Sequence, residues 1–321
     1  MTHPDARPYV WMLCGSFSFT LMAELAVSLT HQCDWQIVAV FRAGLVTLFA
    51  TVLVWAFGAK LVFWPWRLWV RSVAGSCSMI CTFYAFSKLR TADVVTLSNT
   101  FPIWVAVLSW PLYRQAPGLK MWLAILTGVV GVVLVEQPHL EAGNLGVYAA
   151  LAAAVFTAVA MLGLHSLSDI DPRAIVVHFS AVATVVCIGA YLRAAYYDQL
   201  NDTAVHVFDP GIAWKLLAMG VTALIGQLFL TLAFGNGAPA KVSVIGLTQI
   251  VFALTFDVCF LDTQLTGVMV LGTLLVVAPT AWLLTRPKPD VLQAAVPRDS
   301  GQRKPAARFN TMKTRSEKTG V

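Results

Sequence analysis

The chain has 321 residues, of which 58% are hydrophobic and only 12% charged, and its mean hydropathy is +0.73. Soluble domains carry about 25% charged residues, so this composition excludes an ordinary soluble fold and predicts a polytopic membrane protein. The net charge of +6 would suit nucleic-acid binding, but residues 286–321 account for all of it. We expect no nucleic-acid partner, and we interpret 286–321 as a basic, disordered cytoplasmic tail near anionic lipid headgroups.

A membrane-spanning helix needs about 20 mostly apolar residues. Ten segments meet this requirement, namely 9–30, 36–57, 68–88, 92–113, 119–136, 145–166, 173–194, 213–234, 240–261 and 265–285. Several links between them are short and rich in turn-forming residues, which favours hairpins between antiparallel neighbours. The sequence therefore predicts an all-α membrane protein with ten transmembrane helices.

The distribution of Lys and Arg over the links predicts the orientation, because cytoplasmic loops are enriched in positive charge. With both termini inside, eight basic residues outside the tail fall on the inner side and four on the outer side. This count places Arg71 inside and both Lys88 and Arg90 outside. We expect an integral, multi-pass protein of the cell (inner) membrane, with residues 1–8 as a cytoplasmic N-terminus.

The sequence also contains an internal repeat. An offset of 148 residues lays 85–135 on 233–283 without a gap, so that pairs such as Ala85/Ala233, Phe86/Phe234 and Thr100/Thr248 coincide. The repeat divides the chain into halves 9–136 and 145–285, each with five helices. Because five is odd, the second half would be inserted upside down relative to the first. Inverted repeats are typical of secondary transporters, in which the halves rock about a central site.

A family resemblance rests on the repeated region. It is carried by the run Ala85-Phe86-Ser87, Thr91-Ala92-Asp93, Leu97-Ser98-Asn99-Thr100-Phe101-Pro102 and Leu108-Ser109-Trp110, followed by the helix 118–135. This run resembles the EamA type of the drug/metabolite transporter superfamily. The resemblance covers 9–285 and implies two inverted five-helix repeats and the export of a small metabolite. Ile250 stands where the second repeat would match Pro102.

Charges within the membrane are functional candidates, because each one costs at least about 2.5–3.5 kcal/mol on insertion scales. Glu24 and Arg42 lie at similar expected depth on consecutive helices, so they are predicted either to form a structural ion pair or to bind substrate. In the second case Arg42 holds a substrate carboxylate and Glu24 an amine or a proton. Leu21-Met22-Ala23-Glu24 also resembles the first helix of small multidrug resistance proteins, where the Glu exchanges protons with cationic drugs. Asp257 is a further candidate for proton exchange or gating, unless it simply reaches interfacial water.

Four uncharged residues complete the predicted substrate site. Asn99 precedes Pro102, which frees a backbone carbonyl within a helix, and Gln227 and Gln249 are intramembrane amides. Trp104 would supply a cavity wall. Each amide could instead form a hydrogen bond between helices, worth about 0.6–2 kcal/mol.

The predicted function is a secondary transporter, an exporter of a small polar or amphipathic metabolite such as an amino acid, working by alternating access. Proton or counter-substrate coupling would drive it, since no nucleotide-binding loop is recognisable. The alternatives are a nucleotide-sugar or organophosphate antiporter, which should show several basic residues in its cavity, and a membrane-embedded enzyme or sensor. We expect no enzymatic activity, no cofactor and no metal site, membrane lipids and a small-molecule substrate as partners, and a monomer or homodimer.

Overall fold

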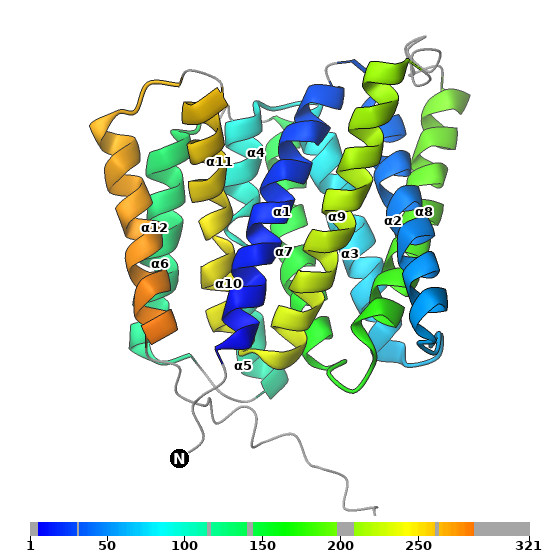
Figure 1. Ribbon diagram of the computed structural model, residues 1–321. Coiled ribbons are helices and arrows are strands. Elements are labelled where there is room, and N and C mark those ends of the chain that lie inside the picture. The colour runs from blue at the N-terminus through cyan, green and yellow to red at the C-terminus, as the bar shows by residue number, and fades with distance from the viewer. Residues whose placement is uncertain are drawn as a thin grey trace, which may run out of the picture. The chain divides into compact units, whose positions relative to one another are not determined.

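The computed structural model describes residues 6–30, 32–113, 117–139, 144–197, 209–260 and 263–285. They form the helices α1 (Arg7–Thr30), α2 (Trp35–Phe57), α3 (Trp66–Phe86), α4 (Thr91–Ser98), α5 (Phe101–Tyr113), α6 (Leu119–Glu136), α7 (Leu145–His165), α8 (Pro172–Tyr196), α9 (Pro210–Asn236), α10 (Pro239–Gly246), α11 (Thr248–Phe260) and α12 (Gly267–Thr285). Figure 1 shows them side by side as a bundle. The predicted tail 286–321 and residues 1–5 lie outside the described residues.

Every segment expected from hydropathy coincides with one helix or with two consecutive short ones. Within the described ranges, nine spans are long and apolar enough to cross a membrane, counting α4–α5 and α10–α11 as one span each. The helix that falls outside this set is α3, which is long enough but carries Arg67, Arg71, Ser72, Ser76 and Ser78. The protein is therefore an all-helical membrane protein in which one long helix is markedly polar.

Two of the expected spans, 92–113 and 240–261, each consist of two consecutive short helices. The first break separates α4 from α5 and the second separates α10 from α11. Thr100 donates its hydroxyl to the Leu97 carbonyl at 2.6 Å, and Thr248 donates to the Ile245 carbonyl at 2.7 Å. A threonine thus bonds the third carbonyl before it at each break, although Pro102 follows only the first.

The polar stripe of α1 faces the second break. Ser16 donates its hydroxyl to the Gly246 carbonyl at 3.4 Å, and Thr20 donates to the Gln249 carbonyl at 3.1 Å. Backbone carbonyls released by a helix break need partners in an apolar environment. These two hydroxyls supply them, so the stripe serves helix packing at this level of the bundle.

The main contacts between helices recur when the corresponding helices of the two chain halves are interchanged. The first long helix, α1, packs along α9, and α3 packs along α7; α5 contacts α7 as α11 contacts α1. Likewise α3 contacts α8 as α2 contacts α9, while α2 pairs with α8 and α6 pairs with α12. Figure 1 shows these last two pairs at opposite sides of the bundle, with α1, α3, α7 and α9 between them.

Large apolar side chains cover much of the outer surface of the helices. Examples with more than half of the side chain exposed are Leu48, Val52, Val185, Leu192, Leu217, Leu271 and Leu274. Soluble monomers rarely expose apolar patches beyond a few hundred Å². This surface is accordingly the face that the hydrocarbon of a bilayer covers.

Opposed glycines hold α6 and α12 together. A Cβ atom added to Gly272 would lie 2.7 Å from the Gly131 carbonyl oxygen, and one added to Gly131 would lie 2.7 Å from the Gly272 oxygen. A Cβ at Gly189 on α8 would meet nothing within 4 Å. The first two positions therefore depend on the missing side chain, whereas the third does not.

We expect Gly272→Ala to destabilise the protein by about 1–3 kcal/mol, because the added methyl overpacks a backbone contact. The matched variant Gly189→Ala should instead raise stability by about 0.5–1 kcal/mol, since it removes only the flexibility of glycine within a helix. Thermal unfolding of both variants in the same detergent measures the difference. Equal melting temperatures would contradict the close α6–α12 contact.

Candidate functional site

A cavity of about 250 Å³ lies within the bundle, among α1, α2, α3, α5 and α7–α11. Most of its wall is apolar. The polar and charged side chains in the wall are Arg42, Arg71, Ser78, Thr82, Thr157, Gln227 and Gln249. Two of these are cations, and the part of the wall that the structure describes contains no Asp or Glu. Ligand sites in proteins commonly combine an apolar wall with a few convergent polar groups.

The predicted site residue Arg42 does line this cavity, but it does not pair with Glu24. Its Nε donates to the Met22 sulfur at 3.2 Å, and one terminal nitrogen donates to the Met79 sulfur. Thioether sulfur is only a weak acceptor. Among the described residues no carboxylate forms an ion pair with Arg42. Of the two alternatives, the structural ion pair is therefore wrong, and no carboxylate of the described residues compensates the guanidinium charge.

A second arginine, Arg71 of α3, lies in the same cavity. Charge counting assigns it to the cytoplasmic end of the helix, yet only 1% of its surface is exposed. Its guanidinium carbon lies 4.2 Å from the ring centre of Phe179 on α8. Its Nε atom is buried, and no atom of the described residues accepts a hydrogen bond from it. The aromatic ring offers attraction to the cation but no acceptor for its N–H groups.

Two glycines make room for Arg71. A Cβ atom at Gly75, one turn further along α3, would collide with a terminal nitrogen of Arg71 and lie 2.7 Å from the Phe179 ring. A Cβ at Gly163 on α7 would lie 3.2 Å from the Arg71 Cβ. The guanidinium thus lies across the bare backbone at Gly75. The spacing of Arg71 and Gly75 does not identify this position in the sequence, because Arg114 precedes Gly118 at the same spacing.

Glu24 and Asp257 are not part of the cavity lining, although Glu24 directly follows the lining residues Met22 and Ala23. Glu24 of α1 has the carboxylate of Asp257 on α11 as its charged neighbour, and Glu136 at the end of α6 interacts with both. Sequence reasoning does not single out Glu136. Three helices therefore bring like charges to one region of the bundle, next to the cavity wall formed by Met22 and Ala23.

The remaining predicted residues divide between cavity and packing. Gln227 on α9 and Gln249 on α11 both line the cavity. Asn99 lies at the first helix break, where its amide donates to the Val95 carbonyl at 2.8 Å. Trp104 is partly buried against an apolar cluster of the core. The structure thus brings Arg42, Gln227 and Gln249 together, and it places Asn99 and Trp104 outside the lining.

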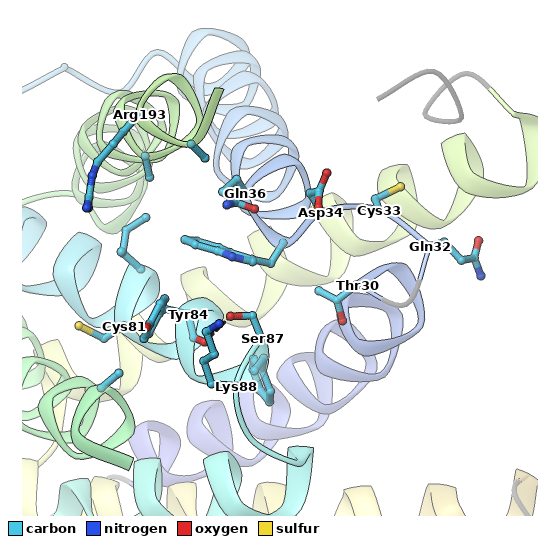
Figure 2. A pocket seen from close by; sticks show the side chains of 16 residues that line it. Thr30, Gln32, Cys33, Asp34, Gln36, Cys81, Tyr84, Ser87, Lys88 and Arg193 are labelled. Carbon is cyan, nitrogen blue, oxygen red and sulfur yellow. Dashed lines mark hydrogen bonds between the residues drawn. The ribbon is translucent and has the colours of Figure 1, made fainter. Parts of the chain in front are cut away.

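A larger vestibule of about 1140 Å³ lies at the end of the bundle where α1 and α3 end and α2 begins. Phe86 belongs to the walls of both the vestibule and the central cavity. Figure 2 shows the vestibule with Lys88 and Arg193 on different walls and Asp34 near the start of α2. The described part of its lining therefore carries one more positive than negative charge.

The other end of the bundle is filled by apolar side chains. One continuous cluster there and along the core contains Tyr9, Met12, Leu68, Leu164, Leu167, Ile175, Leu230, Phe234, Val242 and Ile245. These side chains come from the beginnings of α1, α3, α8 and α10 and the ends of α7 and α9. The central cavity is accordingly adjacent to a wide opening on one side and to packed core on the other.

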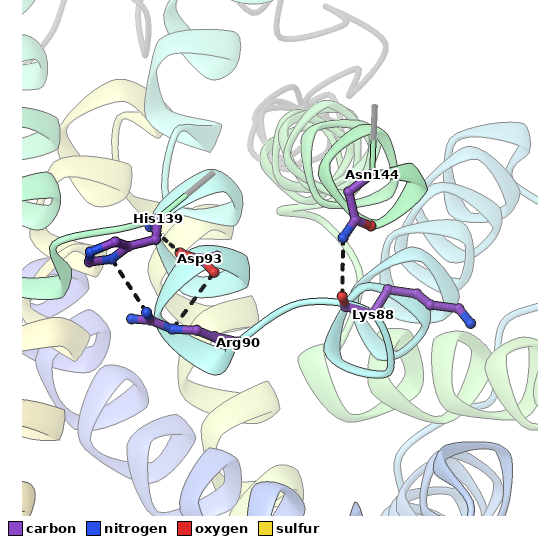
Figure 3. Close-up of polar contacts among 5 residues, drawn as sticks. All are labelled: Lys88, Arg90, Asp93, His139 and Asn144. Carbon is purple, nitrogen blue, oxygen red and sulfur yellow. Dashed lines mark hydrogen bonds and ion pairs between the residues drawn. The ribbon is translucent and has the colours of Figure 1, made fainter. Parts of the chain in front are cut away.

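Polar contacts fix the link between α3 and α4 beside the vestibule. Arg90 pairs with Asp93 at 3.9 Å and meets the His139 ring at 3.3 Å, while the His139 backbone N–H donates to Asp93 at 2.7 Å. The Asn144 amide donates to the Lys88 carbonyl at 3.3 Å, as Figure 3 shows. Arg90 therefore has a nearby counter-charge, whereas the Lys88 side chain lines the vestibule.

Comparison with known proteins decides the family. The model of the EamA-like transporter family matches the chain twice, over residues 6–136 and 144–285. The chain belongs to the EamA-like transporter family. It is thus a multi-pass membrane transporter, in agreement with the resemblance drawn from the run around Pro102.

Named relatives are transporters as well. The chain is 32% identical to the pseudopaline exporter CntI of Pseudomonas aeruginosa over 246 residues, which cover 74% of this chain and 82% of that one. It is 26% identical to solute carrier family 35 member G1 of Mus musculus over 239 residues, 66% of this chain and 60% of the other. A crystal structure with 16% identity superposes with a TM-score of 0.71 over 85% of this chain and 95% of its own, which supports the fold.

Because Arg71 is buried without a counter-charge, removing its charge should stabilise the protein. We expect Arg71→Met to raise the free energy of unfolding by at least about 1 kcal/mol, since the desolvation penalty disappears while the side-chain volume is largely kept. The matched variant Arg67→Met removes an exposed charge from the same helix, together with its bond to the Ser166 carbonyl. It should not raise stability. Thermal unfolding in detergent compares them, and a less stable Arg71→Met would contradict an uncompensated charge.

Proposed function

We propose that the protein is a secondary transporter that exports a small polar metabolite by alternating access of one central cavity to the two sides of the membrane. The observation that carries this proposal is the cavity itself. Its wall combines Arg42 and Arg71 from the first family match with Gln227 and Gln249 from the second. A site built jointly by two halves changes its access when the halves rock against each other. Similarity to an exporter supports the outward direction.

The proposed halves are two inverted five-helix repeats, 9–136 and 145–285, which together give ten transmembrane helices. The family model matches each half separately. The reciprocal helix contacts support the same division, because α1 meets α9 as α7 meets α3. Both helix breaks also fall at the same place in the repeat, with Thr100 and Thr248 bonded alike. A repeat with an odd number of spans reverses its orientation in the membrane.

The proposed topology places both termini in the cytoplasm of a cell (inner) membrane, so the vestibule faces outward. Ser87 lies in the exposed lining of this vestibule. Lys60 is exposed in the link between α2 and α3, at the opposite end of α3. The two positions thus report on opposite sides of the membrane.

In a background without native cysteines, we expect Ser87→Cys to react with a membrane-impermeant maleimide added to intact cells. Lys60→Cys should react only after the membrane is permeabilised, because it would face the cytoplasm. Mass-shift labelling on gels measures both. The reverse labelling pattern would refute the proposed orientation while leaving the family assignment untouched.

We further propose that Glu24 and Asp257 couple transport to protons. Like charges brought together by α1 and α11 repel each other, and this repulsion is strong where water is scarce. A proton bound by either carboxylate relieves the repulsion. Because Glu24 directly follows the cavity-lining residue Ala23 and α1 packs against α11, protonation of these carboxylates can change how the two helices pack beside the cavity.

A pH gradient across reconstituted liposomes should change the flux of a transported compound through the wild type. We expect Glu24→Gln with Asp257→Asn to carry flux that no longer responds to the gradient, because both carboxylates proposed to exchange protons are removed and Glu136 loses these two acidic neighbours. Asp169→Asn, which removes an exposed carboxylate between α7 and α8, is the matched control and should keep the response. An unchanged response in the double variant would exclude this coupling site.

The substrate is best sought by thermal unfolding of the purified protein with individual metabolites, since a ligand that binds the folded state raises the apparent stability. Compounds that stabilise the protein would then be tested for flux into liposomes. Flux that requires the protein and saturates supports the proposal. Binding without any flux would oppose a transport role.

A further inference from the structure

We infer that the central cavity binds a small dianion, with one negative group held by the Arg42 guanidinium and the other by the Arg71 guanidinium. This inference rests on the proposed transport function and names the chemical class of its substrate. It goes beyond the arrangement expected from sequence, in which Arg42 was the single intramembrane cation and Glu24 its partner.

The charge balance of the cavity requires an anion. Two guanidiniums line it, and the described lining has no carboxylate. Arg42 donates to thioether sulfurs, and Arg71 stacks on Phe179 with a buried Nε lacking an acceptor. Burying an uncompensated charge is unfavourable by several kcal/mol. A bound anion supplies both the missing charge and the missing acceptors, since guanidinium and carboxylate or phosphate form paired hydrogen bonds.

The spacing of the two cations favours one ligand with two anionic groups. The Arg71 guanidinium lies at the level of Gly75, and the Arg42 guanidinium lies at the level of Met79. These positions on α3 are one turn apart, about 6 Å along the helix axis. Carboxylates separated by a few carbon atoms span such a distance. A monoanion would leave one of the two guanidiniums without a partner.

Size restricts the ligand further. The cavity volume of about 250 Å³ lies just below the range of about 300–1,000 Å³ that is usual for small-molecule sites. A dicarboxylate or small phosphate ester fits this volume, whereas a nucleotide sugar is far larger. Both dianion types share the chemistry that the arginines recognise. The polar side chains Ser78, Thr157 and Gln227 in the same wall suit additional hydroxyl or amine groups on the ligand.

The vestibule, through which a ligand would reach the cavity, also has an excess of positive charge. The vestibule has Lys88 and Arg193 in its wall with Asp34 as the acidic side chain of its described lining. A concave surface with excess charge of one sign raises the local concentration of oppositely charged ligands. The route of an anion between vestibule and cavity therefore joins a weakly positive region to a more strongly positive site.

The test is thermal unfolding of the full chain in detergent at constant ionic strength, titrated with matched probes. Succinate, glutarate and malate are compared with the half-amide succinamate and the neutral succinamide, and glycerol 3-phosphate is compared with glycerol. We expect at least one dianion to bind at least about tenfold more tightly than its monoanionic or neutral analogue, as the loss of one charged hydrogen-bonded pair predicts. Preference for glycerol 3-phosphate over the dicarboxylates would identify a phosphate ester as the ligand.

Variants assign the effect to the two arginines. Arg42→Gln and Arg71→Gln should each weaken dianion binding at least about tenfold, to the level of the half-amide. Arg67→Gln, an exposed charge on the same helix, should bind as the wild type does. Gly75→Ala offers a second test that keeps the charge, because its methyl would displace the Arg71 guanidinium, and it should weaken dianion binding as well.

The outcomes separate this inference from the proposed function. The inference is overturned if no dianion binds more tightly than its half-amide, or if a neutral or cationic compound is transported equally by the wild type, Arg42→Gln and Arg71→Gln. In that second case transport itself stands. Conversely, selective dianion binding without flux into liposomes supports the site and opposes the transport role.

Discussion

The central part of this structure depends on one constraint. A guanidinium is held in an apolar bundle with no carboxylate among the described residues beside it, and its desolvation is unfavourable. Arg71 is fully enclosed, and its immediate surroundings are an aromatic face and the bare backbone of Gly75. Gly163 of α7 lies against the Arg71 Cβ, which allows α7 to pack closely against α3. Bulky apolar residues at these positions would pack better and remove the charge. Proteins can keep such unfavourable residues at functional sites, which agrees with the proposed dianion site.

The same constraint explains why α3 is the most polar of the long helices. Its cavity-facing positions run from Arg71 through Gly75 and Met79 towards Phe86, where the cavity meets the vestibule. Ser72 bonds the His178 ring of α8 at 2.8 Å, and Ser78, in the cavity wall, bonds Thr157 of α7 at 2.6 Å. One helix thus lines the cavity, borders the vestibule and bonds neighbouring helices. The polar residues that do this lower its hydropathy below that of the other spans.

Much of the architecture could be predicted because hydropathy and repeat symmetry are properties of the sequence itself. The segment boundaries agree with the helices to within a few residues, and the offset of 148 residues aligns the two helix breaks. The breaks themselves were not predicted. Pro102 indicated an irregularity in one half, but Ile250 carries no such signal in the other. There Thr248 donates to the Ile245 carbonyl, and the Gly246 carbonyl accepts from Ser16 of α1. Only tertiary packing reveals that.

The site was less predictable, because depth along a helix does not determine direction around it. Glu24 and Arg42 were placed at equal depth, yet Glu24 lies outside the cavity lining, whereas Arg42 lines the cavity and donates to Met79 on α3. For Arg71 the error was the reverse, since a position near a helix end was taken to be interfacial. A chain that bundles its spans around a cavity can bury such a residue completely. The two errors have one cause, and correcting both replaces the expected ion pair with two arginines in one cavity, on which the proposed dianion site rests.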